Sequence, residues 1–501
     1  MSPARQLSSG PNKAWRAGWI ASRPSARPTG VPTGTDTAPQ PTPGLTATGA
    51  RHPFAEPGIA TELERRETEI GTGFAQLSET LRALASEQFQ DGFADRAVAR
   101  LRAIGVEADP AWFQADWLHP VDMGAVHARA ACRLFATLVE SGSERDRYMS
   151  DDGEPMNELI RRWGFHAVDI TPCADGRLAG LLGAVLRIPL SIVTARKSFA
   201  GAMFNVAQNL HEWEEVELTR HRRGIPNSPD AGTRYLKIGV YHYSSRDPGH
   251  DGCAAHGSHT DTALTLLHDR LIEFQTAAQA MHGAGAEIAL LLIGLDTDTD
   301  AIRVHVPDAA GRMDKARYVD AADLYTRTRD MQRDAAKEAV RAEVARATGV
   351  DPQDEATEGM RWLCGYLLKN NIAQVDAVLQ KYGGPYTVSG HAEKLIVIGD
   401  PVDDVQMRNL AFQAQMNSVE EGAADIAVGV RLLRTHTTTA VPVLVLRGFD
   451  PDIPGDDRSA AEDAERMREA ILAMDTEGPV VVEAALRPGT GGALQFLESR
   501  A

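Results

Sequence analysis

The chain is short of cysteine and of long apolar runs. Its 501 residues include only four cysteines, Cys132, Cys173, Cys253 and Cys364. They are too few and too widely spaced for a disulfide framework, so free thiols or metal ligands are expected. The longest apolar run covers residues 288–295, far below the roughly 18 residues that a membrane span needs, and no charged-then-apolar signal segment opens the chain. We therefore expect a protein of a reducing compartment that does not enter a membrane.

Charge is unevenly distributed along the chain. The formal net charge is −17, yet residues 1–50 carry five basic side chains and one acidic side chain. The same residues hold eight prolines and many Gly, Ser and Thr, a composition that cannot bury enough apolar surface to offset the entropy of ordering. We predict a disordered basic tail over residues 1–55, attached to an acidic body. Because an acidic body repels nucleic acid and anionic membranes, neither is an expected partner.

The tail has three possible roles. Its scarce acids and frequent Arg, Ser and Thr fit an organellar transit peptide. An inert leader and a partner-binding segment fit the same composition, and the sequence does not separate these two.

The rest of the chain divides into three predicted domains. Apolar side chains recur at three- and four-residue steps over residues 56–150, as in FAQLSETLRALASEQF and HARAACRLFATLVESG, which predicts a helical domain with Cys132 in its core. Residues 151–395 combine predicted strands with a predicted helix at 205–223, so an α/β domain is expected. The strands are expected at residues 165–170, 235–243 and 287–296. Cys364 lies in a later helix, where packing is the favoured interpretation.

Residues 396–501 repeat this pattern in a faded form. AEKLIVIGDPVDD echoes HAVDITPCADG, AFQAQMNSVEEGAADIAVGVRLL is interpreted as a helix that echoes residues 205–223, and VPVLVLRGFDPDIPGDD echoes KIGVYHYSSRDPGHDGC. The echoing segments lack the cysteines and the histidine. We interpret the last domain as a degenerate α/β repeat that cannot hold a metal.

Two cysteines are placed where chemistry is expected. Cys173 and Cys253 each lie in a loop just beyond a predicted parallel strand, the edge at which α/β sheets bind ligands. Thiolate and imidazole are ligands that zinc selects, and three protein ligands with one open position define a catalytic zinc site. Asp175 and Arg177 follow Cys173 at every second position. A bidentate arginine would hold the aspartate off the metal, as an acceptor for the proton of metal-bound hydroxide.

Cys-x-Asp-x-Arg, a histidine at a strand end and then a second cysteine resemble the β-class carbonic anhydrases. The helical domain, the faded repeat and the stretches CAAHGSHTD and LLIGLDTDTDAIRVHVP resemble the carboxysome shell carbonic anhydrases in particular, over residues 60–501. The resemblance implies a carbonate dehydratase, a lyase that binds one zinc ion per chain. Its reaction is the reversible hydration of carbon dioxide.

Two histidines compete to be the third ligand. His250 keeps the H-x2-C spacing that ordinary β-class enzymes show, whereas His242 needs a longer loop before Cys253. We favour His242, because in the family the ligand directly follows the sheet strand, and YLKIGVYHY puts His242 there. The carboxysomal relatives share the longer interval.

The resemblance and the site together imply a mechanism. Zinc lowers the pKa of a bound water to ~7, so hydroxide is supplied at neutral pH, and Asp175 is expected to orient it towards carbon dioxide. Regeneration requires a proton relay, since a proton must leave the site in every cycle. His256, His259, His391 and Asp251 are candidates by residue type.

Two rival functions use the same region. His259, Asp261 and His305 resemble the two-histidine, one-carboxylate triad of non-haem iron oxygenases that use 2-oxoglutarate, but this hypothesis leaves the Cys-x-Asp-x-Arg motif unexplained. A non-catalytic zinc scaffold of an assembly would need a fourth protein ligand, and none stands at a suitable spacing. DTDTD, residues 296–300, lacks the glycine and glutamate of a calcium loop and is interpreted as a solvated turn.

The resemblance also suggests a location and partners. We expect the protein in the carboxysome of a bacterial cytoplasm, at the inner face of the shell or in the lumen, where it converts bicarbonate into carbon dioxide for Rubisco. The tail would bind Rubisco, shell proteins or both through several weak contacts. A homodimer or a higher homo-oligomer is expected, because β-class sheets pair.

Overall fold

The computed structural model describes most of the chain beyond the predicted tail. The described residues are 45–46, 49–115, 119–143, 160, 163–188, 193, 195–224, 233–282, 286–308, 310–349, 358–388, 390–402, 407–437, 439–476, 478–489 and 492–498. They belong to one compact unit, Thr42–Ala501. Among them no helix is both long enough and apolar enough to cross a membrane.

Most of the predicted tail, residues 1–44, lies outside the described residues. Its last residues are ordered, which differs from the prediction. His52 and Phe54 are buried, the His52 amide donates to Asp376 Oδ1 at 3.1 Å, and the His52 ring packs against Tyr325. The ordered part of the chain therefore begins before residue 56, because the side chains of His52 and Phe54 are already packed in the protein interior.

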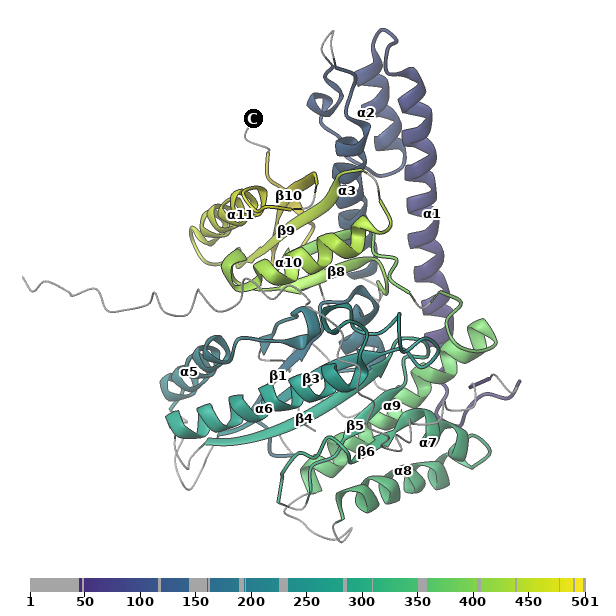
Figure 1. Ribbon diagram of the computed structural model, residues 1–501, viewed down its shortest axis with the longest axis vertical. Helices are drawn as coiled ribbons and strands as arrows, with labels where there is room; N and C mark the ends of the chain where they lie inside the picture. Colours follow the sequence, from purple (N-terminus) through teal and green to yellow (C-terminus); the bar gives the residue numbers. More distant parts are fainter. Residues whose placement is uncertain are drawn as a thin grey trace, which may run out of the picture. The chain divides into compact units, whose positions relative to one another are not determined.

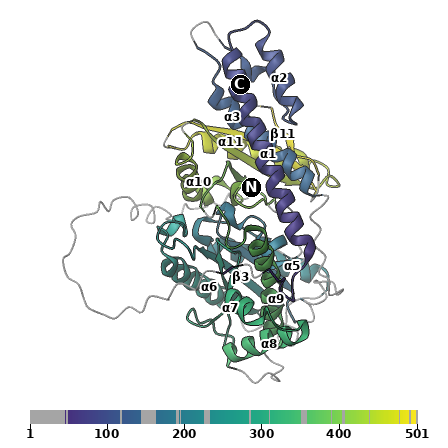
Figure 2. The same cartoon turned by 90° about the vertical axis from the view of Figure 1, so that its right-hand side faces the viewer.

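The region after the tail is helical, as predicted. It consists of α1 (Pro57–Glu87), α2 (Phe93–Ala103) and α3 (Met123–Ser143). Proline stands in the first turn of α1, where its missing N–H costs no hydrogen bond. Helices α1 and α3 run side by side (Figures 1 and 2) and share a core that includes Leu77 and Cys132. Cys132 is fully buried, which confirms that it is a packing residue.

A six-stranded sheet follows, in the order β2-β1-β3-β4-β5-β6. Its strands are β1 (Ala167–Pro172), β2 (Ala195–Arg196), β3 (Thr233–Tyr243), β4 (Ala286–Asp296), β5 (Ile302–His305) and β6 (Tyr318–Asp320). The first four are parallel and the last two antiparallel. Parallel strands are buried on both faces, which explains the continuous apolar runs of β3 and β4. Because β1 and β3 are parallel neighbours, their carboxyl ends meet at one edge.

Helices cover this sheet. They are α5 (Val206–Arg222), α6 (Thr260–His282), α7 (Ala321–Thr328), α8 (Arg333–Thr348) and α9 (Glu358–Tyr382). Helix α6 lies along β3 and β4 (Figure 1). Cys364 on α9 is fully buried, so it too is a packing residue.

The C-terminal sheet has the same strand order as the first. Its strands are β7 (Leu395–Gly399), β8 (Ala411–Gln415), β9 (Val441–Phe449), β10 (Val480–Pro488) and β11 (Gln495–Phe496), and its helices are α10 (Val419–Arg434) and α11 (Asp456–Leu472). Read from one edge, the order β8-β7-β9-β10-β11 matches β2-β1-β3-β4-β5, with four parallel strands and then an antiparallel one in each case. Helix α10 precedes β9 as α5 precedes β3.

One predicted helix begins too early. The sequence pattern predicts a helix over residues 411–433, but the first five residues form β8 and the helix α10 starts at Val419. On one side β8 pairs with β7. On its other side Gln413 N donates to Ala174 O at 2.8 Å and Gln415 N to Ser198 O at 3.0 Å. These tertiary hydrogen bonds override the local helical preference.

The DTDTD turn is buried rather than solvated, which corrects the prediction. Asp296, Asp298 and Asp300 are each at most 4% exposed. Asp298 Oδ2 accepts from Ser244 Oγ at 2.8 Å and from Arg246 N at 2.9 Å, and Asp300 Oδ2 accepts from Tyr386 Oη at 2.7 Å. The charge-rich composition suggested exposure, but these acids instead bind the loop after β3 and the segment after α9.

Candidate metal centre

The two strand-end cysteines and His242 come together at the carboxyl edge of the first sheet. Cys173 directly follows β1, His242 is the penultimate residue of β3, and Cys253 precedes the short 3-10 turn η6 (Ala254–His256). The two sulfur atoms lie 3.9 Å apart. One donor atom from each of the three residues falls within 4.8 Å of the others, and all three side chains are buried.

This trio fits a tetrahedral metal ion. Two sulfur atoms at ~2.3 Å from one tetrahedral ion lie ~3.8 Å apart, close to the observed 3.9 Å. Neither ring nitrogen of His242 has a hydrogen-bond partner among the described residues, although the side chain is fully buried. A buried imidazole without partners is costly unless something binds it. The donor set therefore suits a metal ion, as does an imidazole that makes no hydrogen bond among the described residues.

Asp175 lies beside the trio and is held by Arg177. Asp175 Oδ2 is 3.4 Å from His242 Nε2. Burial alone would raise the pKa of the Asp175 carboxyl, but the positive charge of Arg177, with smaller contributions from His242 and His391, keeps that pKa well below its usual range. Asp175 is therefore an ionised acceptor at neutral pH, although its side chain is only 3% exposed.

Arg177 is fixed from several sides. Burial would lower the pKa of its guanidinium, but Asp175 raises it further above the physiological range. Nη1 donates to Asp251 O at 2.6 Å and to Thr297 Oγ1 at 3.3 Å, and Nη2 donates to Gly252 O at 3.2 Å. Thr297 belongs to the buried DTDTD turn. The sequence did not indicate that this turn would help to hold Arg177. The guanidinium thus has little freedom to leave Asp175.

A second group of acids and histidine adjoins this pair. His391 Nε2 lies 3.0 Å from Arg177 Nη2, and His391 Nδ1 lies 3.3 Å from Asp175 Oδ2 and 3.6 Å from Glu393 Oε1. Burial lowers the pKa of His391, but the carboxylates of Asp175 and Glu393 outweigh it and raise the pKa above its usual value. His391 is the part of this group nearest to solvent, with its side chain 12% exposed.

Glu393 is a residue of the site that the sequence did not predict. Its buried carboxylate accepts from Gly176 N at 3.1 Å, and Gly176 O accepts from Asn409 N at 2.7 Å. A Cβ on Gly176 would stand 2.5 Å from Ala411 O, so a larger residue does not fit. Segments just before and within the second sheet therefore hold the loop that carries Cys173, Asp175 and Arg177.

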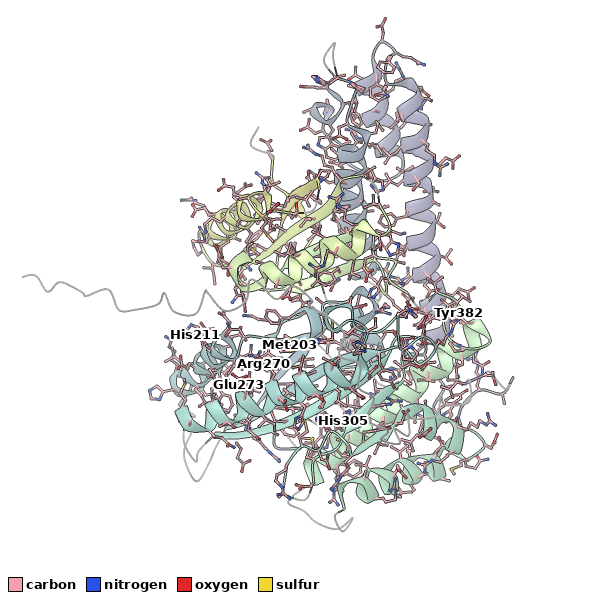
Figure 3. The ribbon with its side chains drawn as sticks, in the orientation of Figure 1. Met203, His211, Arg270, Glu273, His305 and Tyr382 are labelled. Carbon is pink, nitrogen blue, oxygen red and sulfur yellow. The ribbon has the colours of Figure 1, made fainter. Side chains whose placement is uncertain are left out.

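The other histidines named from the sequence are not members of the trio. His250 has its side chain 84% exposed and pairs with Asp247. His256 is partly buried, with Nε2 3.3 Å from Gly201 O, and His259 is exposed. His305, on β5 and labelled in Figure 3, is buried with Nε2 3.0 Å from Tyr241 Oη. The iron hypothesis requires a metal-ligand group formed by His259, Asp261 and His305. Among the described residues, these three side chains do not form such a group.

Family models match three consecutive parts of the chain. Residues 52–142 match the N-terminal domain of the carboxysome shell carbonic anhydrase, residues 155–391 its catalytic domain, and residues 392–478 its C-terminal domain. The catalytic-domain match includes the whole trio, Asp175, Arg177 and His391.

Curated relatives resemble the chain over most of its length. It is 37% identical over 431 residues to the carboxysome shell carbonic anhydrase of Halothiobacillus neapolitanus, with 84% of each chain covered. It is 35% identical over 459 residues to that of Parasynechococcus marenigrum, covering 88% of this chain and 76% of the relative. The protein from Hydrogenovibrio crunogenus is 34% identical over 419 residues, covering 81% and 78%. The chain therefore belongs to the carboxysome shell carbonic anhydrase family, enzymes of the reversible hydration of carbon dioxide.

Proposed function

We propose that Cys173, His242 and Cys253 bind one zinc ion per chain and that this site hydrates carbon dioxide. The observation that carries the proposal is the buried trio, whose sulfur atoms lie 3.9 Å apart and whose imidazole makes no hydrogen bond among the described residues. Two thiolates and one imidazole form a zinc-selective set that leaves a fourth position open. When bound, zinc supplies a hydroxide nucleophile from water at neutral pH.

Asp175 and Arg177 act on the open position. With the metal bound, Asp175 would accept a hydrogen bond from the nucleophile and so orient it, because its depressed pKa keeps it ionised. Arg177 occupies both oxygens of the carboxylate, which stops Asp175 from becoming a fourth ligand. An open position is what separates this enzyme site from a zinc scaffold.

His391 is the best-supported proton relay of the three candidate histidines. Its Nδ1 lies 3.3 Å from Asp175 Oδ2 and its side chain is 12% exposed, so it can take a proton from the site and release it to buffer. His256 hydrogen-bonds Gly201 O, and burial lowers its pKa. His259 is exposed beyond η6. These two remain weaker candidates.

The C-terminal repeat descends from a second site that has lost its ligands. Cys173 N donates to Val240 O at 3.1 Å, and Asp400 N donates to Leu446 O at 2.9 Å in the matching position. This register makes Asp400 the counterpart of Cys173, and Gly448 the counterpart of His242. Asp400 accepts from Gly448 N at 2.6 Å and from Arg447. We accordingly divide the chain beyond the tail into a helical domain (56–150), a catalytic domain (151–395) and a silent repeat (396–501), and the last residues before the helical domain, from His52 on, already pack against the catalytic domain.

The family names place the relatives in the carboxysome shell, and we propose the same location for this protein. There it would dehydrate bicarbonate and supply carbon dioxide to Rubisco. The basic tail would bind Rubisco, shell proteins or both, and the protein would act as a homodimer or larger homo-oligomer.

The direct test is zinc analysis of the purified protein together with stopped-flow hydration of carbon dioxide. We expect about one zinc ion per chain, and Cys173→Ser or Cys253→Ser should lose both zinc and activity. An active protein without stoichiometric zinc would overturn the proposal.

A further inference from the structure

A short strained segment touches the sulfur of Cys173. The 3-10 turn η5 (Ala200–Ala202) lies beside the metal trio, and Gly201 N donates to Cys173 Sγ at 3.2 Å. Gly201 has φ +67°, and the next residue, Ala202, has φ +59°. A left-handed conformation is unfavourable for alanine, and such conformations persist only where neighbours fix them.

Three contacts fix this segment. Ala174 N donates to Phe199 O at 2.9 Å. His256 Nε2 lies 3.3 Å from Gly201 O, and a Cβ on Gly201 would collide with that ring. The third contact comes from the second sheet domain, where Asp425 Oδ1 accepts from Ala200 N at 3.0 Å. The Asp425 carboxylate is therefore one peptide unit away from the N–H that reaches the sulfur.

We propose that Asp425 is a positioning residue for the metal site, which holds the Ala200 amide and thereby keeps the Gly201 N–H directed at Cys173 Sγ. The inference rests on the proposed role of Cys173 as a metal ligand. It gives the silent repeat a specific task in the chemistry of the other sheet, because Asp425 belongs to α10 and is 225 residues from its partner.

An N–H directed at a thiolate ligand changes the metal bond. The hydrogen bond stabilises the sulfur lone pairs, so it favours the metal-binding thiolate over the thiol, raises the energy of charge transfer from sulfur to the metal and orients the ligand. Partners of this kind typically change metal affinity 10- to 100-fold when removed. The loss of Asp425 should weaken the alignment of Gly201 and leave the three ligands in the chain.

The acceptor rather than the charge of Asp425 should matter. Burial raises the pKa of its carboxyl to about 7, so the neutral form is readily populated at neutral pH. A neutral carboxyl still accepts through its carbonyl oxygen, and an asparagine offers the same oxygen. Asp425→Asn should therefore behave like the parent protein, whereas Asp425→Ala should not.

The test uses the full chain loaded with cobalt(II) in place of zinc. The sulfur-to-cobalt charge-transfer band reports the hydrogen bonding of the thiolates, and its presence in the parent protein checks the proposed ligand set independently. We expect the band to move to longer wavelength in Asp425→Ala and to stay in place in Asp425→Asn. Competition with a chelator should show zinc affinity ~10-fold weaker in Asp425→Ala only.

Glu420→Ala is the matched control, because Glu420 is an exposed acid in the first turn of the same helix. It should change neither band nor affinity. If Asp425→Ala does not fold, Asp425→Leu fills the space without an acceptor and takes its place. An unchanged band and affinity in the alanine or leucine variant would overturn the inference, as would an asparagine variant as impaired as alanine. A parent protein without the band would instead refute the ligand set.

Discussion

The guanidinium of Arg177 holds both carboxylate oxygens of Asp175. Nε donates to Oδ1 at 2.9 Å and Nη2 donates to Oδ2 at 2.7 Å, and the Arg177 amide adds a third bond to Oδ1 at 2.9 Å. The two side chains are separated by one glycine, so the loop folds back on itself. A carboxylate bound this way is ionised and aimed, yet cannot easily turn to coordinate a metal.

Asp175→Asn should keep zinc and lose most activity. The amide retains the shape of the side chain but not its charge, so it is a poorer acceptor at the open position. Removal of one positioned partner typically costs ~10²–10³ in rate, or about 2.7–4 kcal/mol. Hydration turnover per bound zinc at neutral pH measures this effect. If the pair only braced the loop, thermal stability would fall while turnover per zinc stayed unchanged.

Arg177→Ala should retain zinc and lose activity for a different reason. Without the guanidinium, Asp175 is free to bind the metal as a fourth ligand, so zinc should be held at least as tightly. The variant should also be less stable, because removing one partner of a buried ion pair typically costs about 3–5 kcal/mol. Chelator competition and urea unfolding test both parts. Weaker zinc binding with normal turnover per zinc would contradict this role for Arg177.

His242→Ala should lose zinc, whereas His250→Ala should keep it. His242 is fully buried in the trio, and His250 is an exposed residue paired with Asp247. The two variants are matched, since each removes one imidazole from the same stretch of chain. Zinc content after dialysis decides between them. Loss of zinc in His250→Ala with retention in His242→Ala would reverse the ligand assignment.

The trio could be predicted because each member follows or ends a strand with a clear apolar pattern. Cys173 and Cys253 stand beyond β1 and β3, and parallel strands bring such positions to one edge. Glu393 and Asp425 could not be predicted in the same way. Their partners, Gly176 and Ala200, are 217 and 225 residues away in the chain, and each contact is to a backbone amide, which has no sequence signature.

His391→Ala should slow turnover without removing zinc. If His391 carries the proton out of the site, kcat should fall by up to ~10²-fold, the lower end of the effect of a positioned acid or base. The effect on kcat/KM should be smaller, because the proton leaves after carbon dioxide has reacted. Added imidazole buffer should restore kcat.

The matched controls for the relay are His256→Ala and His259→Ala, which replace the two other candidate histidines. Neither should show rescue by imidazole. A His391→Ala variant with parental kcat in dilute buffer would exclude this residue as the relay, and rescue of His256→Ala or His259→Ala would move the role there.

His305 should make the fold sensitive to acid. Burial lowers the pKa of its imidazole from 6.5 to about 4. Between these two values the unfolded chain binds the proton more readily than the folded chain, so stability is lost as the pH falls through this window. At pH 5 this one group should lower the free energy of unfolding by about 2 kcal/mol relative to pH 7.5.

The variant His305→Gln has no titrating group at this position. Between pH 7.5 and pH 5 its free energy of unfolding should therefore fall by about 2 kcal/mol less than that of the parent protein. Urea unfolding of both proteins at the two pH values measures this difference. Any loss of metal at low pH affects both proteins equally, because both retain the same trio. His250→Gln is the control, since an exposed histidine contributes little. Equal acid sensitivity of His305→Gln and the parent protein would show that His305 is not the group that titrates.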